Sequence, residues 1–76
     1  MTPYKNLWGD SNVVAYQNWN DFIIVQFWWS GTYTIYTYTL VSAGFSAVET
    51  MKKLAEAGRW LNSYISTHKP WFASKR

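Results

Sequence analysis

The longest uncharged stretch of the chain, residues 22–41, has the apolar pattern of a β-hairpin. Seven of its twenty residues are aromatic, and four threonines, Gln26 and the Ser30-Gly31 pair interrupt the apolar positions. A membrane-spanning helix needs a more continuous aliphatic run. The β-branched and aromatic content instead favours two strands, Phe22–Trp29 and a second from residue 32 to about Val41, joined by a tight turn at Ser30-Gly31.

The residues before this hairpin predict one further strand. Residues 11–17 alternate weakly between apolar and polar, and the Asn18-Trp19-Asn20-Asp21 segment consists of turn-forming residues. Residues 1–10, which include Pro3 and Gly9, are expected to form an irregular lead. The sheet is therefore expected to have three antiparallel strands in a meander.

After residue 44 the apolar period changes to that of a helix. Ser46 and Glu49 have the spacing of a capping box, and Glu49 and Lys53 have the spacing of an ion pair. Gly58 is expected to end or bend this helix. The apolar stripe before Gly58 consists of Val48, Met51, Leu54 and Ala55, and a second helical face follows with Trp60, Leu61, Tyr64, Ile65 and His68.

These elements predict an α+β fold with one or two C-terminal helices packed on one sheet face. The expected domain covers residues 11–68, and residues 69–76 form a basic, aromatic tail that is expected to fray. A two-residue turn sets Phe27 opposite Thr34, Val25 opposite Tyr36 and Ile23 opposite Tyr38 on the face that the helices cover.

The second sheet face is almost as apolar as the first. The short helices predicted after residue 44 cannot cover both faces. It is expected to carry Phe22, Ile24, Gln26, Trp28, Tyr33 and Ile35. Large apolar patches are uncommon on monomers, so this face needs an occupant. The candidates are the N-terminal lead with Tyr4, Leu7 and Trp8, a second copy in a homodimer, stacked nucleobases, or another protein.

Composition limits the classes of function. The chain has 76 residues, no cysteine and a formal net charge of +3, which suits acidic partners without requiring them. It shows no apolar signal-peptide core after residues 1–6, so we expect a cytoplasmic protein with no membrane role. The single His68 and four dispersed acids offer no catalytic pair, no metal cluster and no phosphate loop, so we expect neither an enzyme nor a cofactor.

Binding is then the expected function, and two classes of partner fit the residues. For RNA or another single-stranded nucleic acid, the candidate stacking rings are Trp28, Trp29 and Tyr33, with Lys53 and Arg59 as candidate phosphate contacts. Lys52 and Lys53 also fit a solvated helix face paired with glutamates. An uncharged aromatic face equally suits a protein-interaction or inhibitory module, such as a phage-type protein that occludes a host factor.

Several spacings resemble the KTSC domain, a small module found at the C-terminus of some lysyl-tRNA synthetases and as free-standing bacterial and phage proteins. They cover residues 11–65 and comprise Val14-Ala15-Tyr16, Ile23-x-Val25-x-Phe27, the Ser-Gly hairpin, Tyr36-x-Tyr38-x-x-Val41 and Gly58-Arg59-Trp60-Leu61-Asn62-x-x-Ile65. The resemblance implies a three-stranded sheet packed on C-terminal helices and an RNA-binding role. The family places its Tyr-x-Tyr closer to the hairpin glycine, so either this strand is two residues longer or Tyr33 and Ile35 take those places.

Overall fold

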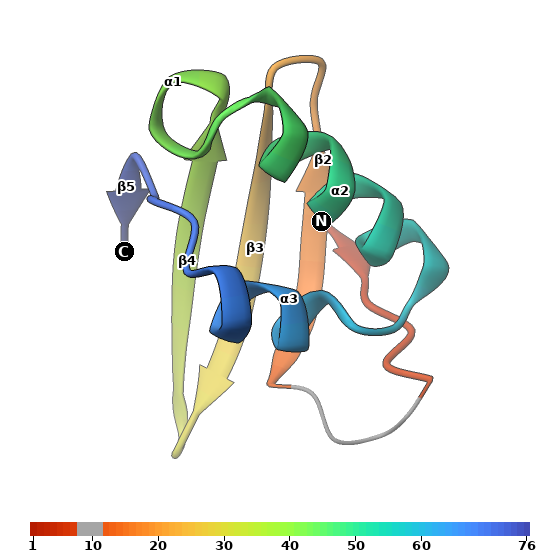
Figure 1. The fold of residues 1–76 in the computed structure, drawn as a ribbon. Coiled ribbons are helices and arrows are strands. Elements are labelled where there is room, and N and C mark those ends of the chain that lie inside the picture. The colour runs from red at the N-terminus through yellow and green to blue at the C-terminus, as the bar shows by residue number, and fades with distance from the viewer. Residues whose placement is uncertain (8–11) are drawn as a thin grey trace.

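An antiparallel sheet followed by C-terminal helices makes up the fold (Figure 1). The computed structural model describes residues 1–7 and 12–76, and in that part of the chain the sheet has five strands in the order β1-β2-β3-β4-β5. The strands are β1 (Thr2–Pro3), β2 (Val13–Asn18), β3 (Phe22–Trp29), β4 (Thr32–Thr39) and β5 (Ser74–Lys75), and the helices are α1 (Leu40–Ala43), α2 (Phe45–Ala57) and α3 (Leu61–His68). The α+β class is as predicted.

The central hairpin, β3 and β4, confirms the predicted turn and register. Ser30 and Gly31 both have positive φ, 46° and 89°, as the two central residues of a type I′ turn require. The strands then pair without a bulge from Phe22–Thr39 to Trp29–Thr32. The three predicted facing pairs are all present: Phe27–Thr34, Val25–Tyr36 and Ile23–Tyr38.

The expected three-stranded sheet is wrong in its strand number. β1 lies in the lead that was expected to be irregular, and it pairs with Ala15 and Tyr16 of β2. β5 lies in the tail that was expected to fray, and it pairs with Tyr36 and Thr37 of β4. Both additions are two residues long, too short for an alternating pattern to reveal them.

The helices begin differently from the prediction and end as expected. The capping box is formed by Thr39 and Ser42 at the start of α1, whereas α2 begins after Gly44 without a side-chain cap, so the box predicted at Ser46 is absent. Glu49 pairs with Lys52 at 3.3 Å. Gly58 ends α2 in the left-handed conformation, φ 77°, and α3 follows.

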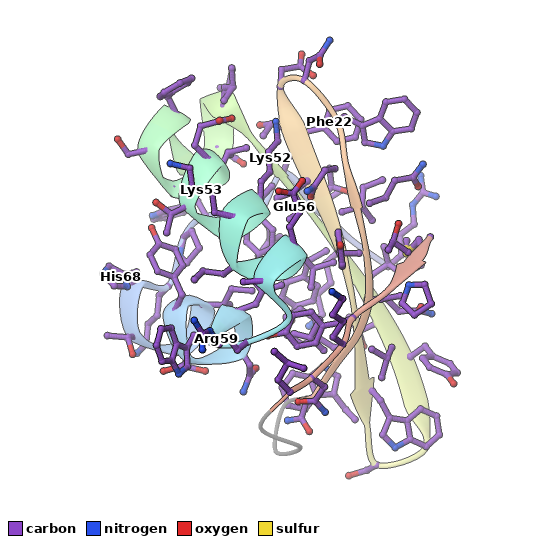
Figure 2. All side chains as sticks on the ribbon, turned by 90° about the vertical axis from the view of Figure 1, so that its right-hand side faces the viewer. Phe22, Lys52, Lys53, Glu56, Arg59 and His68 are labelled. Atoms are coloured by element: carbon purple, nitrogen blue, oxygen red, sulfur yellow. The ribbon has the colours of Figure 1, made fainter. Side chains whose placement is uncertain are left out.

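All three helices lie on the same side of the sheet (Figures 1 and 2). The side of the sheet that the helices cover, which we call the inner face, supplies half of the buried core residues, and α2 and α3 supply most of the rest. Tyr4 is also buried in the core. Its hydroxyl accepts a hydrogen bond from the Leu61 amide at 3.2 Å. The largest fully buried side chains are Val13, Ile23, Val25, Phe27, Tyr38, Val48, Met51 and Leu61.

The other side of the sheet, which we call the outer face, carries no helix in the part of the chain that the structure describes (Figure 2). Residues 1–7 of the lead do not cover it: Tyr4 packs on the helical side, and the Leu7 amide donates to the Gly58 carbonyl at 2.7 Å. Trp8 lies outside the described residues. By strand alternation and register the outer face consists of Ala15, Gln17, Phe22, Ile24, Gln26, Trp28, Tyr33, Ile35, Thr37 and Thr39.

Candidate nucleic-acid interface

Two of the predicted stacking rings lie together on the outer face. Trp28 and Tyr33 are cross-strand partners whose ring centroids are 4.8 Å apart in an edge-to-face arrangement. Their side chains are 42% and 58% exposed, so the helices do not enclose them. The prediction of an open aromatic surface next to the hairpin turn is confirmed for these two residues.

The third predicted ring, Trp29, lies on the opposite side of the sheet. Successive side chains of a strand alternate between faces, so Trp29 shares a face with Phe27. The two rings stack with centroids 5.4 Å apart. Trp29 therefore does not form one surface with Trp28 and Tyr33, although the three are close in sequence.

The predicted phosphate contacts, Lys53 and Arg59, also lie on the helical side (Figure 2). Lys53 is exposed on α2, and Arg59 follows the turn at Gly58. They are separated from Trp28 and Tyr33 by the full thickness of the helical layer and the sheet. The five residues predicted from sequence therefore divide between two sides of the molecule and do not form one site.

The charges of the chain are strongly segregated along the sequence. Residues 59–76 contain four cations, Arg59, Lys69, Lys75 and Arg76, and no Asp or Glu. Residues 1–58 contain three lysines and four acids, a net charge of −1, so residues 59–76 account for the whole net charge of +3. This C-terminal segment, which includes α3 and β5, is the basic part of the protein.

Aromatic rings follow one side of α3, and cations lie next to them. The Arg59 guanidinium lies over the Trp60 ring, 4.7 Å from its centroid. Tyr64 follows four residues later, and His68, four residues later again, stacks on the Tyr64 ring at 4.2 Å. The spacing of four keeps Tyr64 and His68 on one side of the helix, and Trp60 lies just before its first residue.

At its C-terminal end α3 borders an open groove against the inner side of β4. The groove has a volume of about 570 Å³ and is lined by Tyr36, Tyr38, Ile65, Lys69, Pro70, Trp71 and Phe72. Lys75 adds a second cation, because its Nζ lies 5.5 Å from the centroid of the Tyr36 ring. Trp71 is 79% exposed at the rim. We call these residues, with Lys75, the C-terminal groove.

The backbone is left-handed at both ends of α3. Trp60 has φ 67° and Lys69 has φ 47°, values that residues with a side chain rarely adopt. The Lys69 amide still donates to the Ile65 carbonyl at 2.9 Å, which ends the helix. Such conformations are concentrated at functional sites, and here they set the directions in which a ring and a cation leave the helix.

The floor of the groove includes a tyrosine with a perturbed pKa. Burial raises the pKa of Tyr38 well above its ordinary value, and the neighbouring Tyr36 raises it further. Tyr38 is almost fully buried, so its phenol stays neutral well into the alkaline range.

The C-terminal groove was not predicted from the sequence, although its residues carry a signal. The absence of any acid after Glu56, with Trp71 and Phe72 among the cations, marks residues 59–76 as a cationic aromatic segment. What the pattern could not show is that β5 pairs with β4, which brings Phe72 and Lys75 against Tyr36.

In the described part of the chain, no three His, Cys, Asp or Glu side chains gather closely enough to hold a metal ion. No helix among these residues has both the length and the apolarity needed to cross a membrane.

Comparison with protein-family models, with curated proteins and with solved structures gives no match to this chain. The resemblance to the KTSC domain therefore stays a prediction that rests on the quoted spacings.

Proposed function

We propose that this protein is a non-catalytic module that binds single-stranded nucleic acid, and that it does so through the C-terminal segment, residues 59–76. The observation that carries the proposal is the segregation of charge: four cations and no acid lie in the same segment as the rings of Trp60, Tyr64 and Trp71. Single-strand binding requires rings on which bases stack and cations that follow the phosphates.

The path of the bound nucleic-acid strand follows from the order of the rings and cations along residues 59–76. One part runs along α3, past Arg59, Trp60 and the Tyr64–His68 stack. The other part enters the C-terminal groove, where a base has aromatic walls and its phosphate has Lys69 and Lys75. A groove of about 570 Å³ is in the size range of small-ligand sites, about 300–1,000 Å³.

The binding surface that was predicted from the sequence, around Trp28 and Tyr33, supports this function less well. β2, β3 and β4 contribute no charged side chain to the outer face. Nucleic-acid affinity depends mostly on phosphate neutralisation, and rings without cations give little of it. The proposal therefore keeps Arg59 from the predicted set and moves the stacking rings to α3 and the tail.

The test is the salt dependence of binding to a labelled oligouridylate, measured by fluorescence anisotropy. We expect affinity to fall linearly with salt on a double-logarithmic plot, with a slope of about −0.7 for each phosphate neutralised on a single strand. Lys69→Gln, Lys75→Gln and Arg59→Gln should each weaken binding and make the slope shallower by up to about 0.7.

The matched control is Lys52→Gln, on the neighbouring helix α2. Lys52 already interacts with Glu49 and with the Asn20 carbonyl, at 3.3 and 2.9 Å, so its removal should leave both affinity and slope unchanged. Absence of oligouridylate binding at low salt, or an equal effect of all four substitutions, would contradict the proposal.

A further inference from the structure

The proposed nucleic-acid binding does not involve the outer face. It is a largely apolar surface on the side of the sheet away from the helices and the C-terminal groove (Figure 2). We propose that the outer face binds the same face of a second copy of this chain, so that two sheets pack back to back in a two-fold dimer.

The pattern of side chains on the outer face is self-complementary. From one end of the central hairpin to the other, the cross-strand pairs on this face are Phe22–Thr39, Ile24–Thr37, Gln26–Ile35 and Trp28–Tyr33. A two-fold axis that runs across the strands, between the sheets, sets the first pair against the last and the second against the third. Each strand then lies over its own copy, so Tyr33 meets Thr39 and Ile35 meets Thr37 of the second copy, whereas Trp28 meets Phe22.

This arrangement keeps the two sheets evenly spaced. Aligned sheets pack about 10 Å apart, and the proposed axis gives both ends of the interface the same set of side chains, with large facing small along β4. An axis along the strands would instead stack Trp28 and Tyr33 of both copies at one end and force the sheets apart there. The side chains therefore select the first axis.

The distribution of charge also favours a second copy. The charged residue that register places beside the outer face is Arg76, which exchanges backbone hydrogen bonds with Ile35. The proposed axis sets it opposite Ser74 of the second copy, because Ser74 pairs with Thr37 in the adjacent row. Two copies of a chain with net charge +3 can thus meet without juxtaposed cations.

The size of the face is adequate for a small interface. β3 and β4 have eight residues each, so the face is about 26 Å long at about 3.3 Å per residue, and four strand spacings of about 4.8 Å make it about 19 Å wide. Because β1 and β5 are only two residues long and β2 has six, the strands cover a planar area of about 400 Å². Protruding rings increase the accessible area towards the about 800 Å² per partner of a standard interface.

The experiment is sedimentation equilibrium of the full chain from micromolar to millimolar concentration. We expect the wild type to be dimeric at the upper concentrations. Gln26→Lys introduces a charge at the centre of the face and should weaken dimerisation at least tenfold. Ala57→Lys adds the same charge at an exposed position of α2, on the helical side, and should leave the dimer intact.

Circular dichroism keeps the outcome interpretable. Gln26 and Thr37 lie on the helix-free side of the sheet, so lysine at either position should preserve the fold of the monomer, and Thr37→Lys serves as the second variant if Gln26→Lys does not fold. A wild type that stays monomeric throughout, or a dimer that all three lysine variants preserve, would overturn the proposal. Oligouridylate binding by Gln26→Lys monomers should be unchanged, which separates this proposal from the proposed function.

Discussion

The outer face and the C-terminal segment are both rich in aromatic rings, and they differ in charge. The outer face combines Trp28, Tyr33 and Phe22 with threonine, isoleucine and glutamine, and β2, β3 and β4 add no ion to it. The C-terminal segment combines Trp60, Tyr64 and Trp71 with four cations and no acid.

The contrast teaches that ring content alone does not indicate a ligand. Rings on a neutral, regular sheet favour an equally neutral and regular surface, because burial of apolar area is then the dominant attraction. Rings interleaved with cations favour a polyanion with flat bases. The experiments that follow ask whether each region acts alone.

The largest expected effect is on nucleic-acid binding by the charge-reversed variant Lys69→Glu/Lys75→Glu. Removing two phosphate contacts and adding two negative charges to the groove should weaken oligouridylate binding by about a hundredfold or more at low salt. Fluorescence anisotropy measures the loss, and sedimentation should show the same dimer as for the wild type. Retained affinity would exclude the groove as the binding site.

A smaller effect is expected from the substitution Trp71→Ala. Stacking contributes about 1–3 kcal/mol per base, so affinity for oligouridylate should fall about tenfold, since about 1.4 kcal/mol corresponds to a factor of ten. Trp71 is mostly exposed, and thermal unfolding should not change. An equal loss of affinity in Trp28→Ala/Tyr33→Ala would remove the distinction between the two regions.

The same Trp28→Ala/Tyr33→Ala variant should weaken dimerisation by several-fold to tenfold. These rings occupy one end of the outer face, and peripheral aromatic contacts typically contribute about 1 kcal/mol. The variant should stay folded, because both side chains are about half exposed in the single chain. If it unfolds instead, the two rings belong to the core and neither surface interpretation holds for them.

The smallest effect concerns Tyr38, which belongs to both the core and the groove. Its pKa is raised in the folded chain and lies at its ordinary value of about 10 in the unfolded chain. The unfolded chain therefore loses this proton first as pH rises, so the contribution of Tyr38 to stability is complete below about pH 10 and declines above it, by at most about 1.4 kcal/mol per pH unit.

Urea unfolding of the wild type and of Tyr38→Phe at neutral and alkaline pH measures this difference. Tyr38→Phe should lose less stability than the wild type between pH 9 and 11, a range of about two units around the ordinary tyrosine pKa. Parallel curves for the two proteins would show that Tyr38 does not titrate on unfolding in this range.

Local signals made the central part of the fold predictable. Phe22–Trp29 was predicted with its correct bounds, because apolar alternation and the Ser30-Gly31 turn fix both register and face. Gly58 was predicted as a helix end for an equally local reason, its freedom to adopt positive φ. The uncovered second face followed from comparing the number of helical residues with the two apolar faces.

The predictions that were wrong depend on contacts between distant residues, or on which face of the sheet a side chain of a strand occupies. β5 exists only because Ser74 meets Thr37, and no local pattern encodes that pairing. Helix α1 starts at a Thr39–Ser42 box that lies within the predicted strand end. The placement of Trp29 with Trp28 was avoidable, since strict alternation already assigns Trp29 to the side of Phe27.

The segregation of charge has a consequence for how the protein would meet a polyanion. With a net +4 in residues 59–76 and −1 in residues 1–58, each chain carries an electric dipole moment whose positive end lies towards α3 and the tail. A long-range field would turn an approaching chain before contact, so encounters would begin with the C-terminal segment forward. In a back-to-back pair the two moments would oppose each other, and either end of the assembly could make the first contact.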